Sequence, residues 1–131
     1  MALTLSNLLF LGAIVCICQH ELDAINEGEW RFFFQHISVS DKTAYRIFTA
    51  LHVLMFAAFF LWYPLQLFQI FVDVFLIFHA GLHYALRNNP HIGFDNAFSW
   101  VWILGGAVFG GLHLLNFLYI RIVSKCKPPS R

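Results

Sequence analysis

Four long apolar segments alternate with short polar stretches along the chain, over residues 3–19, 45–63, 65–86 and 97–120. Each is close to the ~20 residues that a helix needs to cross a ~30 Å hydrocarbon layer. Helices are expected because lipid cannot satisfy exposed backbone groups. The pattern predicts an all-α integral membrane four-helix bundle. It forms one domain over residues 1–131, with helices at about 3–30, 43–63, 65–87 and 97–123.

The polar stretches predict how these helices are connected. Only Trp62-Tyr63-Pro64 separates the second and third segments, so a tight hairpin is expected there. Proline removes a helical hydrogen bond, and Trp and Tyr favour the membrane–water interface. Residues 87–93 predict a polar turn. The first connection is longer, and Ser40 or Asp41 is expected to cap the helix that follows.

The amino-acid composition also indicates that the chain is surrounded by lipid. The chain is 60% hydrophobic and 11% charged, whereas a soluble domain carries about 25% charged residues. So small a soluble core could not bury 16 phenylalanines among its 131 residues. The expected partner is therefore the lipid bilayer. A net charge of +1 gives no reason to expect nucleic acid as a partner.

Basic residues predict the orientation of the bundle. Four of them lie at the C-terminus, namely Arg121, Lys125, Lys127 and Arg131. Lys and Arg favour the cytoplasmic side, and four spans put both termini on one side. We therefore predict a multi-pass protein of the cell inner membrane with cytoplasmic termini. The stretch from His20 to Arg31 then faces outward, although Arg31, Lys42 and Arg46 in the first loop reduce the charge asymmetry.

The stretch from His20 to Arg31 holds four of the seven acidic residues, at the outward end of the first helix. The alternating direction of the helices brings His52, His79 and His83 to the same leaflet. His79 and His83 are four residues apart and share one helix face. His20, Asp23 and Glu27 follow at i, i+3 and i+7, again on one face.

Helix bundles hold metals between such faces. We therefore predict a metal site ligated by His20, Asp23, His79 and His83, with His52 as a supporting residue or additional ligand. Imidazole with carboxylate suits zinc, and iron is the alternative. Glu21 or Glu27 is predicted to move the proton. In the simpler interpretation these histidines only hydrogen-bond neighbouring helices, at ~0.6–2 kcal/mol each.

Three further features predict packing and anchoring. Asp73 and His113 are expected at one level nearer the inner side, where a hydrogen-bonded pair would neutralise the carboxylate. Gly106-x-x-x-Gly110 predicts a close helix contact within the bundle, with a homo-oligomer face as the alternative. Glu29-Trp30-Arg31 is interpreted as an interfacial segment in which Arg31 pairs with a nearby acid.

These motifs also carry a resemblance. The segments His20-Glu21-Leu22-Asp23-Ala24 and Glu29-Trp30-Arg31, together with Phe78-His79, Leu82-His83 and Asn89-Pro90-His91, resemble an uncharacterised family of small four-span bacterial membrane proteins. More loosely, the chain is similar to the HXXEE-motif membrane proteins, although Asp23-Ala24 stands where that motif has two glutamates. The resemblance names no activity, so the predicted chemistry rests on the spacing of the residues.

The sequence thus favours a metal-dependent membrane hydrolase acting on a lipid-like substrate. It contains no recognisable serine or cysteine nucleophile motif. One alternative is a non-enzymatic carrier or sensor of protons or metal ions, since histidines titrate near neutral pH. The other is a structural accessory subunit that uses the polar cluster to lock its helices together.

Overall fold

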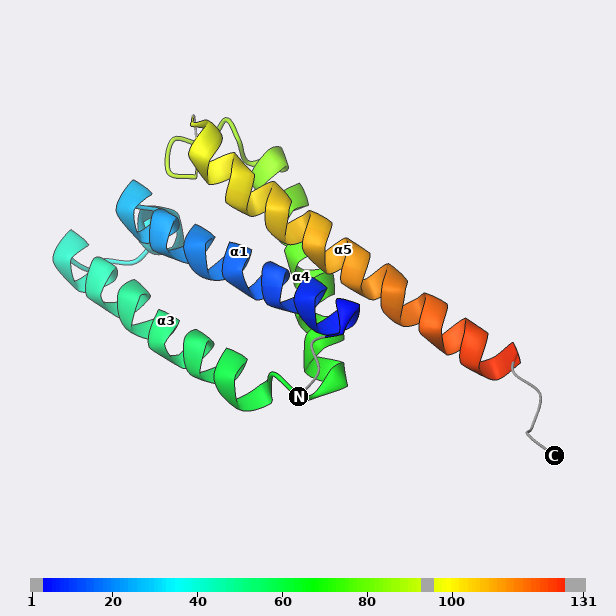
Figure 1. The fold of residues 1–131 in the computed structure, drawn as a ribbon. Helices are drawn as coiled ribbons and strands as arrows, with labels where there is room; N and C mark the ends of the chain where they lie inside the picture. Colours follow the sequence, from blue (N-terminus) through cyan, green and yellow to red (C-terminus); the bar gives the residue numbers. More distant parts are fainter. Residues whose placement is uncertain (1–3, 93–95, 127–131) are drawn as a thin grey trace.

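The computed structural model describes residues 4–92 and 96–126, which form helices and connecting turns (Figure 1). The helices are α1 (Leu5–Glu27), α2 (Trp30–Phe34), α3 (Asp41–Trp62), α4 (Gln66–Ala85) and α5 (Ala97–Cys126). These residues contain no strand, and the predicted all-α bundle is confirmed. The four long helices are long and apolar enough to cross a membrane, so the chain has the features of a multi-pass membrane protein.

The first helix ends earlier than the predicted residue 30. Gly28 has a φ of 79° and its N–H donates to the carbonyl of Ala24, so the chain leaves α1 after Glu27. A left-handed residue at this position is a common helix ending, and glycine adopts it without steric cost. The next residues, beginning with Glu29, turn back into the short α2.

The following helices have clear boundaries. The Ser40 side chain accepts a hydrogen bond from the Thr43 N–H at 3.3 Å, which confirms the predicted cap of α3. α3 and α4 form the predicted hairpin, in which the Leu65 N–H donates to the Trp62 carbonyl at 2.9 Å. α5 continues to Cys126, three residues beyond the predicted end.

Tight packing joins α1, α4 and α5. Phe10, Ala13 and Ile17 of α1 pack with Val72 and Leu76 of α4 in the main apolar core. α3 differs, because Ala44 and His52 are its only buried residues. In Figure 1, α1 lies between α3 and α5. The bundle is thus a compact group of three helices with a loosely attached fourth.

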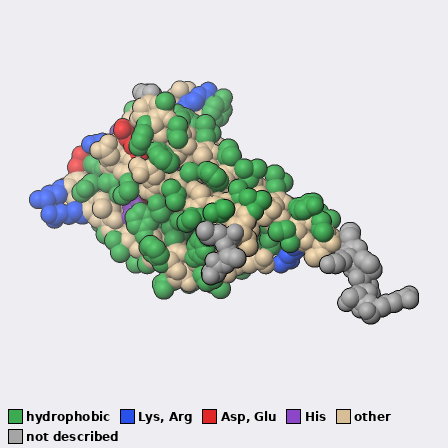
Figure 2. All heavy atoms as spheres, viewed as in Figure 1, with side chains coloured by type: hydrophobic (Ala, Val, Ile, Leu, Met, Phe, Trp, Pro, Cys, Tyr) green, Lys and Arg blue, Asp and Glu red, His purple; other side chains and the backbone are tan. Residues whose placement is uncertain are grey.

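The surface suits lipid. Hydrophobic side chains cover much of the face drawn in Figure 2, and charged side chains gather near its ends. Phe60 is 86% exposed and Leu67 is 80% exposed. Exposed apolar surface on this scale would be costly in water but costs little in hydrocarbon.

Glycines bring α5 close to α4. A Cβ added at Gly106 would lie 3.1 Å from Leu76 Cδ2, and one added at Gly110 would lie 3.2 Å from Asp73 Cα. The Gly106-x-x-x-Gly110 pair therefore serves a contact within the bundle. At Gly111 nothing lies within 4 Å of an added Cβ.

This difference between adjacent glycines predicts opposite effects on stability. Gly110→Ala should lower the free energy of unfolding by roughly 1–3 kcal/mol, because the neighbouring atoms belong to the α4 backbone and cannot move aside. Gly111→Ala should leave it unchanged or raise it by up to about 1 kcal/mol, because alanine favours the helix. Denaturation in mixed micelles measures both, and equal effects would contradict this packing.

Candidate metal centre

Three histidines meet inside the bundle. His79 Nε2 lies 2.9 Å from His20 Nε2 and 3.1 Å from His83 Nε2. One ring nitrogen from each residue lies within 4.8 Å of the others. His20 is 1% exposed and His83 is 2% exposed. The histidine group, as we call these three residues, could hold a metal ion.

Local sequence explains why the rings converge. His79 and His83 are one turn apart on α4, so both project from the same face. Ala24 follows His20 by one turn on α1, and Ala80 is adjacent to His79. These two alanines are buried in one apolar cluster with Ile103 of α5. Their small side chains allow α5 to pack closely against both α1 and α4 beside the histidine group.

The proton inventory of the histidine group favours a cation. A neutral imidazole carries one N–H, yet His79 Nε2 faces two other ring nitrogens. His79 Nε2 offers either one N–H or one in-plane lone pair, so a neutral His79 ring cannot form a well-aligned hydrogen bond with both neighbours. Zinc–nitrogen bonds of ~2.0–2.1 Å in tetrahedral geometry place neighbouring nitrogens about 3.3–3.4 Å apart. The two distances to His79 Nε2, 2.9 and 3.1 Å, are slightly shorter than this spacing.

Glu29 joins the histidine group from the turn that follows α1. Its carboxyl oxygen Oε1 lies 3.7 Å from His83 Nε2, and the residue is 5% exposed. Burial raises the pKa of Glu29 to about 8, and the nearby negative charge of Glu21 adds to this rise while His52 opposes it. A cation at the histidine group would favour the carboxylate and reverse the shift. The sequence pattern alone indicated an interfacial segment for Glu29, together with Arg31.

Arg31 itself pairs differently from the prediction. Its guanidinium carbon Cζ lies 4.4 Å from the centre of the Trp30 ring, in a cation–π contact. Trp30 is only 7% exposed and belongs to the packed interior. Because Gly28 ends α1, this segment folds over the end of the bundle instead of extending the helix. Gly28, two residues before Trp30, is the sequence signal for this turn, and its backbone has a positive φ.

His52 contacts Glu21, not the histidine group. The Phe48 carbonyl can only accept, so His52 Nδ1 donates to it, at 2.7 Å. His52 Nε2 lies 2.8 Å from Glu21 Oε2. Both ring nitrogens of His52 are therefore engaged. The Glu21 carboxylate is held at a cavity that His79 and His83 also line.

Asp23 and Glu27 lie away from the histidine group. Asp23 Oδ2 accepts a hydrogen bond of 2.5 Å from Ser99 Oγ and so ties α1 to the start of α5. Three residues along an α-helix fall about 60° short of a full turn, so Asp23 faces α5 while His20 faces α4. Glu27 is exposed. Of the five predicted ligands, the structure brings only His20, His79 and His83 together.

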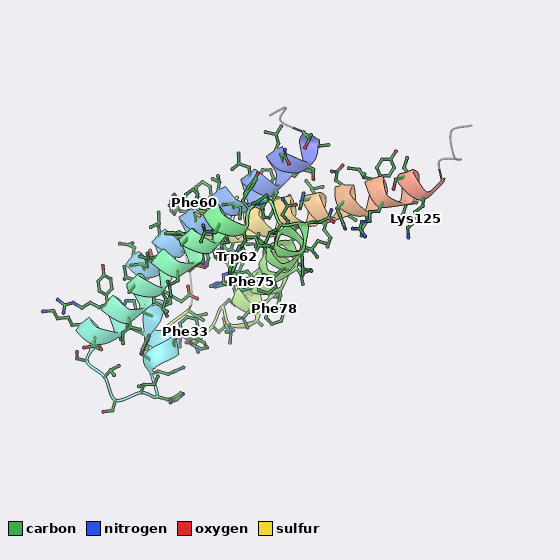
Figure 3. The ribbon with its side chains drawn as sticks, turned by 90° about the horizontal axis from the view of Figure 1, so that it is seen from below. Phe33, Phe60, Trp62, Phe75, Phe78 and Lys125 are labelled. Carbon is green, nitrogen blue, oxygen red and sulfur yellow. The ribbon has the colours of Figure 1, made fainter. Side chains whose placement is uncertain are left out.

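A cavity of about 240 Å³ borders the histidine group. Its polar wall contains Glu21, Glu29, His79 and His83, and its apolar wall contains Phe32, Phe33, Phe48, Phe75, Leu82 and Ile92. Phe33 and Phe75 lie on the side of the molecule between α3 and α4 (Figure 3). They are 54% and 39% exposed. The cavity thus connects imidazoles and carboxylates with the lipid-facing side.

A second polar group lies deeper in the bundle. His113 Nδ1 lies 2.6 Å from Asp73 Oδ2, which confirms the predicted pair. Ser6 Oγ, which was not expected, lies 3.0 Å from His113 Nε2. On α4, the buried Leu76 separates Asp73 from His79 by about one turn on each side. The two polar groups are therefore separated by apolar core.

The fold and the histidine group define a multi-pass helical membrane protein with a candidate three-histidine metal site. A family of unknown function (DUF6713) matches residues 6–120, and the chain belongs to this family. Neither the curated proteins nor the solved structures contain a match. Membership of an uncharacterised family agrees with the resemblance described above. The HELDA and EWR segments as its signature, and the similarity to HXXEE-motif proteins, stay predictions.

The histidine group predicts stoichiometric metal binding. Protein purified in detergent should contain about one equivalent of a divalent transition metal, measured by elemental analysis. A His79→Ala/His83→Ala double variant should lose it, because one imidazole cannot hold the ion.

Matched controls separate these ligands from other polar residues. A His36→Ala/His91→Ala variant removes two exposed histidines and should keep the metal. Asp23→Asn should keep it as well, since Asp23 bonds Ser99. Metal content well below one equivalent, or equal content in both double variants, would rule out the site.

Proposed function

We propose that this chain is a zinc-dependent membrane hydrolase acting on a lipid-like amphiphile, with His20, His79 and His83 as the ligands. The supporting observation is the convergence of three imidazole nitrogens beside a cavity that also holds two carboxylates. Three protein ligands with an open fourth position are typical of catalytic zinc, whereas structural zinc is fully ligated by protein. Bound zinc would lower the pKa of a water towards ~7 and polarise the substrate.

Glu21 is the proton acceptor in this proposal. Oε2 of Glu21 is held by His52. Glu21 also lines the cavity beside the histidine group, so its other carboxyl oxygen would reach a water there. His52 acts as a positioning residue, because its Nδ1 is anchored on the Phe48 carbonyl. Glu29 supplies a second carboxylate on the His83 side. The exposed Glu27, predicted from the sequence for proton transfer, has no part in the proposal.

The cavity walls support an amphiphilic substrate. Its polar wall suits a hydrolysable head group, and its phenylalanine wall suits a hydrocarbon chain. A second cavity of about 260 Å³ shares Phe75 with the first and is lined only by apolar or aromatic residues of α1, α3 and α4. Because α3 buries so few residues, the gap between α3 and α4 offers a lateral path from the bilayer.

The expected orientation stays part of the proposal. Arg121 and Lys125 lie near the end of α5, and Lys127 and Arg131 of the basic cluster lie outside the described residues. With cytoplasmic termini in the inner membrane, the histidine group would lie near the outer leaflet. The looser similarity to HXXEE-motif proteins fits this proposal. The carrier and the structural alternatives stay predictions, and the apolar layer around Leu76 does not favour a polar path through the bundle.

Glu21→Gln tests the catalytic assignment. It should lower kcat by roughly 10²–10⁴-fold, the usual contribution of a general base, and leave the zinc content unchanged. Glu27→Gln is the matched control and should keep full activity. Activity is measured on the zinc-loaded protein with fluorogenic ester, amide and phosphodiester lipids in micelles. Absence of hydrolysis across this set, or amide and phosphodiester turnover that survives both zinc chelation and Glu21→Gln, would refute the proposal.

A further inference from the structure

Ser6, His113 and Asp73 form a chain of hydrogen bonds across three helices. Asp73 Oδ2 lies 2.6 Å from His113 Nδ1, and His113 Nε2 lies 3.0 Å from Ser6 Oγ. Asp73 is 0% exposed and His113 is 2% exposed, whereas Ser6 is partly exposed. This is the order of contacts in a serine-hydrolase triad, which is recognised by geometry and roles and not by position in the sequence.

The direction of the protons follows from the carboxylate. An ionised Asp73 can only accept, so His113 Nδ1 carries the hydrogen and Nε2 presents its lone pair to the Ser6 hydroxyl. Asp73 Oδ1 has no hydrogen-bond partner among the described residues. Among the described residues, the Asp73 carboxylate therefore hydrogen-bonds His113, and its negative charge would stabilise the protonated His113 ring.

The surrounding packing fixes this arrangement. Gly110, one turn before His113 on α5, allows the Asp73 backbone to approach to a distance that a side chain would obstruct. The Phe10 ring lies 5.2 Å from the His113 ring, centre to centre. The imidazole is thus held between a carboxylate, a serine and an aromatic wall. Buried ionisable groups in membrane helices are costly and mark functional sites by default.

Ser6 lies in the first turn of α1, where backbone N–H groups have no acceptor within the helix. The Thr4 side chain caps one of them, the Asn7 N–H, at 3.2 Å. The positive end of the helix favours negative charge. An oxyanion that develops next to Ser6 Oγ would therefore be stabilised by this end of α1.

We propose that Ser6, His113 and Asp73 form a second catalytic centre, in which Ser6 is the nucleophile for acyl transfer from a carboxylic ester of a membrane amphiphile. The centre is independent of the histidine group, because Leu76 and the apolar core separate the two. The serine was not apparent from the sequence because the three residues are far apart along the chain and belong to no local motif.

The neighbouring surface supports the class of substrate. An open groove of about 450 Å³ runs between α1 and α5, lined by Leu5, Leu9, Leu112, Leu115, Asn116 and Tyr119. Ser6 follows Leu5, one of these residues, along α1. Leu5 and Leu115 are each 64% exposed. An acyl chain that lies in this groove would bring its ester carbonyl to the start of α1, where Ser6 lies.

Acyl transfer begins at the Ser6 hydroxyl. Ser6 Oγ bonds to the ester carbonyl carbon while its proton passes to His113 Nε2. The bond from that carbon to the alkoxy oxygen breaks, and His113 returns the proton to the leaving alcohol. Water then attacks the acyl-serine ester with the same assistance. It releases the carboxylic acid and restores the Ser6 hydroxyl.

Covalent labelling tests the nucleophile directly. The full chain in lipid nanodiscs is treated with an alkyl fluorophosphonate, and the labelling rate at Ser6 is followed by mass spectrometry. Wild type should be labelled at Ser6, and Ser6→Ala should lose this labelling. Asp73→Asn keeps the shape of the side chain and should slow labelling by roughly 10²–10⁴-fold.

Two controls test whether the labelling depends on this centre alone. Ser124→Ala removes an exposed serine that bonds the Arg121 carbonyl, and it should label like wild type. The His36→Ala/His91→Ala variant, which removes two exposed histidines, should also label at the wild-type rate. Helical circular dichroism verifies folding of each variant. Folded wild type without label at Ser6, or a labelling rate unchanged in Asp73→Asn, would show that the hydrogen bonds are only structural.

Discussion

Three imidazole rings face one point inside a bundle whose interior is mostly apolar. His20 and His83 are almost completely buried, and His79 lies between them at hydrogen-bond distance from both. In a medium of low polarity, converging lone pairs are expensive unless a proton or a cation lies between them. The one N–H or lone pair of His79 Nε2 aligns well with one neighbouring ring at a time, whereas a divalent ion can accept a lone pair from all three rings. The three histidines thus link α1 to α4 and give this end of the bundle a candidate metal site.

The uneven packing of the helices gives that chemistry access to lipid. α1, α4 and α5 pack closely through small residues such as Ala24, Ala80 and Gly106. α3 contributes little to the core, and its buried His52 serves to hold Glu21. The resulting gap places a cavity lined by phenylalanines directly beside the imidazoles. A fourth helix packed as tightly as the others would have closed the polar groups off from the bilayer.

The fold could be predicted from the sequence because apolar segments of this length have only one stable form in lipid. The pairing of His79 with His83, and of Asp73 with His113, also followed from helical spacing and depth. The bond from Asp23 to Ser99 did not follow from the spacing, because residues i and i+3 were treated as one face although the 60° difference turns Asp23 towards α5. The role of Glu29 depended on where α1 ends, which a single glycine decides. Rotation of one helix about its axis against another leaves no periodic signal in the sequence.

The most direct test of this account is X-ray absorption at the zinc edge on the metal-loaded protein in lipid. Our account predicts four light-atom neighbours at about 2.0–2.1 Å, with the outer-shell scattering expected of three imidazole rings and one further oxygen. The His79→Ala/His83→Ala protein should lose this signature. A shell made only of oxygens, sulfur from Cys16 or Cys18, or fewer than three imidazoles would contradict the claim that the histidine group binds the ion.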